Sequence, residues 1–259
     1  MSAYYFGFCG KGGGGVAVTA APAATVVVMK RYELKYILDP IQTEYFIKSL
    51  EGHMRIDGYG LTSVASLYYD TPDRRLIIRS IEKPKFKEKI RVRSYGVATD
   101  DSPVFLELKR KAEGVVYKRR VQTTVPEAER FFAGEDVFSD GQINREITFF
   151  RDHYGKLVPA CMIICDRTAY YEPDGDLRLT IDASPRYRVT DLDLRAPAEG
   201  KLLLPEGYTV LEIKVQQSIP LWLSAILDKG GIYKASFSKY GTAYKQQMTM
   251  NTERGQNNV

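Results

Sequence analysis

The sequence predicts an α+β fold in which about eight mostly antiparallel β-strands form one sheet, with helices at its periphery. Three observations lead to this fold class. Segments rich in sheet-forming residues recur along the chain, short turns join several of them directly, and stretches with helical spacing separate the rest. Nearly every predicted strand also alternates apolar and charged residues, so it has one apolar and one charged face. That pattern suits an open sheet with helices on its apolar face, and it equally suits a closed barrel with a polar interior.

The first predicted strand covers residues 30–38 and is followed by a helix with clear start and stop signals. Asp39 is the expected N-cap, Pro40 takes the first helical position, and Gln42 is placed to complete a capping box. Gly52 then ends this helix, because glycine readily adopts the conformation that terminates helices.

The remaining elements follow from the same rules of periodicity and turn chemistry. Expected strands cover residues 63–69, 86–94, 104–111, 115–121, 160–171, 177–182 and 208–215. Expected helices cover residues 74–79, 126–132, 142–154 and 220–227, with a short helix near the C-terminal end. Residues 183–206 are expected to form a loop that has room for one short strand.

Both ends differ in composition from the rest of the chain. Residues 1–28 contain a run of glycines and a run of small residues, and their apolar part is too short to span a bilayer. We therefore expect a flexible N-terminal extension over residues 1–28, a folded domain over residues 29–248 and a disordered tail over residues 249–259. The three cysteines are an odd number, which fits reduced, buried thiols in a cytoplasmic protein.

The most distinctive stretch covers residues 86–121, where like charges recur at every second position. Lys87, Lys89, Arg91 and Arg93 fall on one face of a single predicted strand. Two like charges about 4 Å apart repel by roughly 4 kcal/mol at an effective dielectric constant near 20. One interpretation of this row of charges is the water-facing side of a sheet. A surface that binds nothing, however, usually has carboxylates interspersed among its cations. The excess of one sign therefore indicates a bound polyanion.

Composition narrows the function classes further. The net charge of +5 permits an anionic partner without requiring nucleic acid, and no nucleic-acid motif is recognisable. Only two histidines occur, so neither a histidine-based metal cluster nor a Ser-His-Asp triad is expected.

In the barrel arrangement, one set of cations would point inward together: Lys35, Arg91, Arg93, Lys109, Lys118, Arg167, Arg178 and Lys214. Burying so many cations in a dry core would cost several kcal/mol per ion. The interior must therefore be wet or hold an anion. A chain of phosphates fits, because arginine and lysine bind phosphate oxygens in complementary ways.

A series of motifs runs in order through residues 30–245: RYELKYIL, SLYYDTPD, KIRVRSYG, FLELKRK, YKRRV, DRTAYYE, LRLTID, VLEIK and SFSKYGTAY. This series resembles the vacuolar transporter chaperone (VTC) domain, the polyphosphate polymerase domain of the triphosphate tunnel metalloenzyme superfamily. The resemblance implies a closed antiparallel eight-stranded β-tunnel with a basic lumen and peripheral helices. It also implies an ATP-polyphosphate phosphotransferase, which moves the γ-phosphate of ATP onto a growing inorganic polyphosphate with a divalent metal, Mn²⁺ or Mg²⁺.

The resemblance also assigns expected roles to residues. The expected catalytic contacts to phosphate are Lys35, Arg91, Arg93, Lys109 and Arg167. The expected substrate-binding residues are Lys118, Arg178, Ser238 and Lys239, which Lys214 joins from the inward-pointing set. Glu212, within VLEIK, corresponds to the metal-binding glutamate of the family. One position departs from the fungal form of the family, which has a lysine where this chain has Ser236; Lys234 lies nearby as a substitute.

Two other functions remain open. The same superfamily contains tripolyphosphatases and thiamine triphosphatases, which typically carry an ExExK strand, whereas this chain has Arg31 before Glu33 and Lys35. The low carboxylate count favours the polymerase, although Glu33, Glu107 or Asp182 could position a water molecule for hydrolysis. The second alternative is a non-catalytic module that binds polyphosphate.

The expected partners are ATP and inorganic polyphosphate, and nucleic acid is not expected. No segment has the length and apolar character of a membrane span. Coupled export of a polymer would therefore need a membrane partner subunit.

Overall fold

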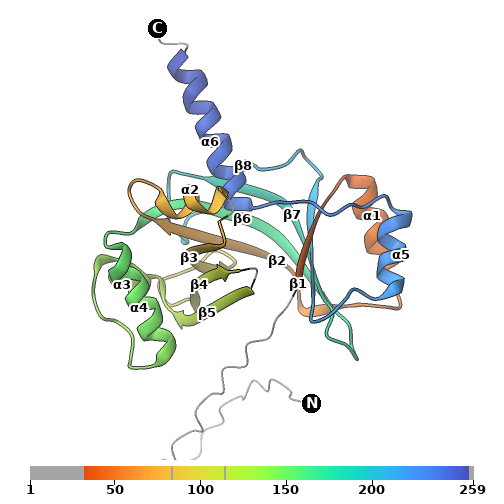
Figure 1. The fold of residues 1–259 in the computed structure, drawn as a ribbon, viewed down its shortest axis with the longest axis horizontal. Coiled ribbons are helices and arrows are strands. Elements are labelled where there is room, and N and C mark those ends of the chain that lie inside the picture. Colours follow the sequence, from red (N-terminus) through yellow and green to blue (C-terminus); the bar gives the residue numbers. More distant parts are fainter. Residues whose placement is uncertain (1–31, 83, 114, 257–259) are drawn as a thin grey trace, which may run out of the picture.

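The computed structural model describes residues 32–82, 84–113 and 115–256, and one sheet contains all of their strands (Figure 1). The strands are β1 (Tyr32–Leu38), β2 (Arg55–Asp70), β3 (Phe86–Tyr95), β4 (Val104–Ala112), β5 (Val115–Thr123), β6 (Val158–Tyr171), β7 (Arg178–Arg188), β8 (Lys201–Leu202) and β9 (Thr209–Val215). The helices are α1 (Pro40–Ser49), α2 (Arg75–Ile81), α3 (Val125–Ala133), α4 (Gln142–Tyr154), α5 (Leu221–Lys229) and α6 (Lys239–Gln256). The predicted α+β class is confirmed.

The strands follow the order β1-β9-β7-β6-β2-β3-β4-β5, and β8 pairs with β7 beside this path. The pairings of the described residues are antiparallel throughout. The long central strands β2 and β6 curve, and the two ends of the order turn toward each other (Figure 1). Lys109 of β4 consequently reaches Glu33 of β1, with 2.9 Å between Nζ and Oε2.

The prediction of a closed, eight-stranded tunnel was wrong in two respects. The sheet has nine strands, because the two-residue strand β8 pairs with β7. The sheet is also not closed: within the described residues no backbone ladder joins β5 to β1. One physical reason lies at the edge of β1, where Tyr36 forms a β-bridge with Lys234 and the amide of Ala235 donates to the carbonyl oxygen of Lys35. A segment before α6 therefore occupies backbone groups that a neighbouring strand would need.

Two strands extend further than their sequence patterns predicted. β2 begins at Arg55 instead of residue 63, and β7 continues to Arg188, into residues expected to form a loop. The pairing of β6 with β7 has a register shift between Ile164 and Asp166, and Ser184 on the opposite strand has a positive φ of 44°. This bulge lets β7 continue pairing beyond the point where its clean alternation stops.

The predicted capping box of α1 is confirmed. The Asp39 carboxylate accepts a hydrogen bond from the backbone N–H of Gln42 at 2.8 Å, and the Gln42 side-chain oxygen accepts one from the backbone N–H of Asp39 at 3.2 Å. α3 begins with the same arrangement, made by Thr124 and Glu127. These caps satisfy amide groups that a helix leaves free at its first turn, so both helices start at fixed positions against the sheet.

Apolar side chains form three clusters, and two of them lie between the helices and the side of the sheet opposite its charged face. One cluster lies between the sheet and the pair α3 and α4, and a second lies between the sheet and the pair α1 and α5. A third includes Tyr68, Ile77 and Tyr240, so α2 and α6 pack together over one end of the sheet. The charged residues of the central strands alternate with the first two clusters and therefore line the opposite, concave face, which we call the inner face.

The two ends of the described chain differ in how much of each predicted end segment they include. Residues 1–28, expected to form an extension, lie outside the described residues. α6 runs to Gln256, so it includes residues 249–256 of the expected tail. None of the helices in the described part of the chain is long and apolar enough to cross a membrane.

Candidate functional site

A buried carboxylate gathers arginines and a lysine at the β3–β5 end of the inner face. Glu107 of β4 is 1% exposed, and its carboxylate lies 2.7 Å from Arg91, 2.7 Å from Lys118 and 2.6 Å from Arg120. Arg93 lies 3.9 Å away. Burial alone would raise the pKa of Glu107, but the adjacent Arg91, Arg93 and Lys118 hold that pKa well below its usual range. This Glu107 cluster therefore keeps one fixed negative charge among four cations.

Neighbouring hydroxyl groups orient the two arginines of β3. Arg91 donates from Nη1 to the Tyr68 hydroxyl at 2.8 Å, and Arg93 donates from Nε to the Ser66 hydroxyl at 3.2 Å. Both hydroxyls come from β2, because Tyr68 pairs with Arg91 and Ser66 with Arg93 in the β2–β3 register. The guanidinium groups are thereby held in place before any ligand arrives.

A second buried carboxylate, Asp182 of β7, is fully buried and holds cations from two other elements. Arg167 of β6 makes a bidentate contact with its carboxylate, with Nε at 2.6 Å and Nη2 at 2.8 Å. The Nζ of Lys239, at the start of α6, lies 2.5 Å from the same carboxylate. Burial alone would raise the pKa of Asp182, but Lys239 and Arg167 hold it well below its usual range. We call this group the Asp182 cluster.

The third group lies on β1 and β9, where residues of opposite charge are paired across the two strands and also along β9. Lys35 pairs directly with Glu212, and Glu33 with Lys214. Glu212 is also 3.1 Å from Lys214 of its own strand. Burial would raise the pKa of Glu212, yet Lys214 and Lys35 hold it well below its usual range, while burial lowers the pKa of Lys35. Every charge in this β1–β9 group therefore already faces an opposite charge.

Ser238 links the inner face to α6. Its hydroxyl accepts from Lys89 of β3 at 3.1 Å and from the amide of Gly241 at 3.3 Å. Lys89 is half-buried, and burial lowers its pKa to about 8. Ser238 and Lys239 thus come from one segment but serve different groups, since Ser238 contacts Lys89 and Lys239 contacts Asp182.

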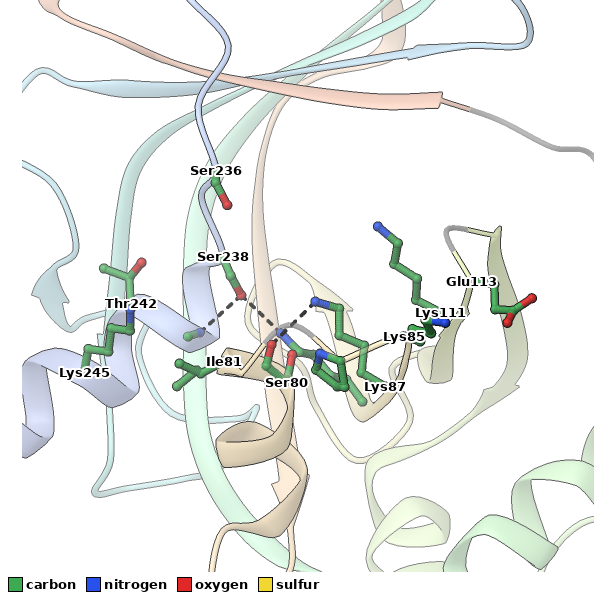
Figure 2. A pocket seen from close by; sticks show the side chains of 13 residues that line it. Ser80, Ile81, Lys85, Lys87, Lys111, Glu113, Ser236, Ser238, Thr242 and Lys245 are labelled. Carbon is green, nitrogen blue, oxygen red and sulfur yellow. Dashed lines mark hydrogen bonds between the residues drawn. The ribbon is translucent and has the colours of Figure 1, made fainter.

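A cavity of about 860 Å³ opens beside Ser238, between the start of α6, the end of α2 and the adjoining ends of β3 and β4 (Figure 2). Its charged lining consists of Lys85, Lys87, Lys89, Lys111, Lys245 and Glu113. Ser236, the position that departs from the fungal pattern, also lines this cavity. Lys234, the suggested substitute, bridges to Tyr36 in the backbone and is not among the lining residues.

Most of the predicted site residues come together on the inner face in the three groups described. Arg178 is the exception, because its side chain is exposed, donates to the carbonyl oxygen of Leu177 and stacks over Tyr171. Sequence reasoning left two further cations without a role, Lys89 and Arg120. The signal for both was present, since each lies two residues from a selected cation on the same strand face.

A divalent metal needs oxygen ligands, and the described residues offer few that are not already paired. No group of three or more His, Cys, Asp or Glu side chains suitable for a metal occurs among them. Glu212, with Glu33 diagonally across the β1–β9 register, is the best-placed carboxylate. Mg²⁺ in particular is usually held by one or two carboxylates together with substrate phosphates. Glu212 fits a metal that arrives bound to a triphosphate, and does not fit a metal held by the protein alone.

Together these groups can bind a linear polyanion. Each carboxylate holds its cations in place and limits their mutual repulsion, and an arriving phosphate oxygen can replace or share those contacts. The four cations around Glu107 exceed the charge of that carboxylate, so this part of the inner face has positive charge left for a ligand.

Comparison with known families places the described domain in one of them. A family model described as the VTC domain matches residues 30–248. No curated protein matches the chain.

Solved structures with the same fold are distant in sequence. A Bacillus halodurans protein, provisionally assigned as an adenylate cyclase, has a TM-score of 0.51 and 12% identity, over 81% of this chain and 96% of that one. A Hippeastrum protein, provisionally assigned as an adenylyl cyclase and described as having a dominant triphosphatase activity, has a TM-score of 0.51 and 16% identity, over 83% and 95% of the two chains. At these identities the similarity establishes the fold alone.

Proposed function

Because the chain belongs to the VTC domain family, which its residues 30–248 match, we propose that it is a metal-dependent polyphosphate polymerase. In this proposal it transfers the γ-phosphate of ATP to a growing inorganic polyphosphate chain on the inner face of the sheet.

The observation that carries the proposal is the excess of positive charge around Glu107. Four cationic side chains from β3 and β5 surround a single carboxylate, and neighbouring hydroxyl groups fix two of them. Arginine guanidinium groups hold phosphate oxygens in a defined orientation, and fixed positive charge stabilises a phosphoryl group in transfer. The arrangement suits a substrate that carries several phosphates in a row.

We assign the residues of the inner face as follows. The groups that contact the reacting phosphates are Lys35, Arg91, Arg93, Lys109 and Arg167. The groups that bind the remaining phosphates of donor and acceptor are Lys118, Arg178, Lys214, Ser238 and Lys239. The Arg178 side chain is exposed and stacks over Tyr171, so its replacement should have the smallest effect.

The reaction needs no general base. The terminal phosphate of a polyphosphate already presents an ionised oxygen as nucleophile, so in-line positioning and charge neutralisation can supply the catalysis. The histidines are consistent with this mechanism. His53 stacks on Trp222 with 4.2 Å between ring centroids, and His153 lies on α4 beside Phe149, both away from the inner face.

A divalent cation, Mn²⁺ or Mg²⁺, completes the proposal. When bound, it would neutralise phosphate charge, and Glu212 is the residue that would hold it. Lys214, 3.1 Å from Glu212, and Lys35, directly opposite Glu212 in the strand register, are placed to contact phosphate oxygens beside it.

A triphosphate hydrolase is the second candidate, because the structurally similar Hippeastrum protein is described as having a dominant triphosphatase activity. Hydrolysis needs a positioned water molecule instead of a second phosphate chain. Glu33, a member of the β1–β9 group diagonally across from Glu212, is the carboxylate placed to do so.

One experiment separates these functions. Purified protein is incubated with ATP and Mn²⁺, then with tripolyphosphate and Mn²⁺, while polymer is resolved by gel and ³¹P NMR and ADP and free phosphate are followed. Polymer with one ADP formed per phosphate added supports the polymerase. Free phosphate without polymer identifies a hydrolase, and tight polyphosphate binding without turnover identifies a binding module.

A further inference from the structure

The cavity beside α6 differs from the inner-face clusters in how its charges are balanced. Five lysines line it, Lys85, Lys87, Lys89, Lys111 and Lys245, against the single carboxylate of Glu113. Figure 2 shows the side chains of Lys85, Lys87 and Lys111 gathered at the ends of β3 and β4, across the space from Ser236 and Thr242. The Glu107 and Asp182 clusters each form around a buried carboxylate, whereas the cavity has none at its centre.

Cross-strand pairing makes this arrangement unfavourable without a ligand. In the β3–β4 register, Lys87 lies directly opposite Lys111, and Lys89 directly opposite Lys109. Like charges directly opposite one another on a sheet destabilise it. Within the described part of the chain, Lys89, Lys111 and Lys245 make no salt bridge that would offset the repulsion. A local arrangement that lowers stability in this way points to a functional site.

The cavity is continuous with the inner face along β3. Lys87, Lys89, Arg91 and Arg93 alternate with the buried residues Ile90 and Val92, so their side chains form one row. Successive members of the row are about 6.6 Å apart along the strand, twice the rise per residue. A linear anion bound at Arg91 and Arg93 can therefore follow this row into the cavity without crossing an apolar surface.

The size and lining of the cavity also limit its ligand. About 860 Å³ lies within the range of ordinary ligand pockets, roughly 300–1,000 Å³. Lysines and hydroxyl groups dominate the lining, and lysine binds phosphate as a point charge without the fixed geometry of arginine. That chemistry suits a flexible stretch of phosphates held at variable positions more than a single phosphate held for reaction.

We propose that this lysine cavity is a binding subsite for the part of a polyphosphate chain that extends beyond the inner-face clusters, and that it gives the protein a preference for long chains. The identity of the ligand rests on the proposed function, whereas the subsite itself rests on the cavity. Tripolyphosphate is short enough to bind at the Glu107 cluster alone. A long chain also reaches the cavity and releases the repulsion among its lysines.

The test compares the binding of two ligands by isothermal titration calorimetry, without ATP or metal. The variant is Lys85→Gln combined with Lys111→Gln and Lys245→Gln, whose side chains are all exposed. The matched control changes three exposed lysines that do not line the cavity: Lys48→Gln, Lys156→Gln and Lys229→Gln. Both triple variants lose the same charge, so they separate the effect of the cavity from that of net charge.

We expect the cavity variant to lose about tenfold or more in affinity for long-chain polyphosphate, while its affinity for tripolyphosphate changes less than about twofold. The control variant should keep the ratio of the two affinities found for the unmodified protein. Equal losses for both ligands, or an unchanged affinity for the long chain, would overturn the subsite. The single variant Lys245→Glu on α6 gives the same comparison if the triple variant does not fold.

The design also separates this inference from the proposed function. An unmodified protein that binds long chains more tightly than tripolyphosphate, with the preference lost in the cavity variant, supports the subsite even if ATP yields no polymer. A protein that makes polymer but whose cavity variant binds long chains normally keeps the proposed function and overturns the subsite. A protein that binds neither ligand overturns both.

Discussion

Lys109 of β4 and Glu33 of β1 form an ion pair of 2.9 Å between strands that share no backbone hydrogen bonds. The pair joins β1, at one end of the strand order, to β4, the neighbour of the strand at the other end. A side-chain contact between charged residues therefore holds the two ends of the open sheet near each other. The consequence is a junction that depends on charge, and hence on salt, more than a backbone ladder would.

Replacing Glu33→Gln should lower the free energy of unfolding by less than about 1 kcal/mol, because both side chains are partly exposed and the pair is screened by solvent. The difference from the unmodified protein should shrink as salt is raised. Urea unfolding of the two single variants, Glu33→Gln and Lys109→Gln, and of the double variant measures the pair as a cycle. A coupling energy that does not change with salt would contradict this account of the junction.

Glu107→Gln should be far more destabilising, by about 3 kcal/mol or more, since it leaves several partly buried cations without their counter-charge. Urea unfolding gives the value, with exposed Glu206→Gln as a control expected to change stability by less than about 0.5 kcal/mol. Tripolyphosphate should restore more stability to the Glu107→Gln variant than to the unmodified protein, because the anion replaces the missing charge. Equal stabilisation of both proteins would argue against binding at this cluster.

Glu212→Gln should reduce metal-dependent turnover by about 10²-fold or more, because the change removes the carboxylate assigned to the metal. Binding of polyphosphate without metal should be kept or become tighter, since a negative charge beside Lys35 and Lys214 is lost. Turnover assays over a range of Mn²⁺ concentrations, together with metal-free calorimetry, measure the two effects separately. Unchanged turnover would remove Glu212 from the metal site.

The affinity for long-chain polyphosphate, which reaches the cavity lined by Lys89, should fall as the pH rises from 7 to 9. Burial lowers the pKa of Lys89 to about 8, so this lysine is mostly charged at pH 7 and mostly neutral at pH 9. Lys87 of the same strand, Lys109 of the neighbouring β4 and Lys35 of β1 add to the shift, while Tyr68 opposes it. The ligand is anionic throughout, so loss of the lysine charge weakens binding.

Lys89→Arg provides the control for this pH dependence. Arginine stays charged over the whole range, so the variant should lose less affinity than the unmodified protein between pH 7 and 9. Any titration of the ligand itself affects both proteins equally. Calorimetry at constant ionic strength measures both curves, and parallel curves would show that Lys89 does not control the effect.

Much of the inner face follows from periodicity alone. Arg91 and Arg93 on one strand, Glu107 and Lys109 on the next, and Glu212 and Lys214 on a third each alternate with apolar residues, so the assignment of charged side chains to one face was confirmed. The capping box at Asp39 was equally local and equally predictable. These features depend on neighbours within a few residues, which a sequence displays directly.

The pairing of those charges was not predictable in the same way. Asp182 meets Lys239, and Lys109 meets Glu33, across separations of 57 and 76 residues. No spacing rule links such positions, because their contact depends on strand order, on curvature and on where α6 begins. The lysine cavity likewise needs α2, α6 and the ends of β3 and β4 to meet.

By itself the sequence determined the α+β class, most of the helices and strands, and a cationic face suited to a polyanion, because local spacing sets which side a residue points to. Only the tertiary structure decided that the sheet stays open and which carboxylate holds which cations. It also decided that Lys89, Lys111 and Lys245 line one cavity without a salt bridge among the described residues. Those outcomes depend on the competition between distant segments for the same edge and the same charges, such as residues 234 and 235 against a neighbouring strand at the edge of β1.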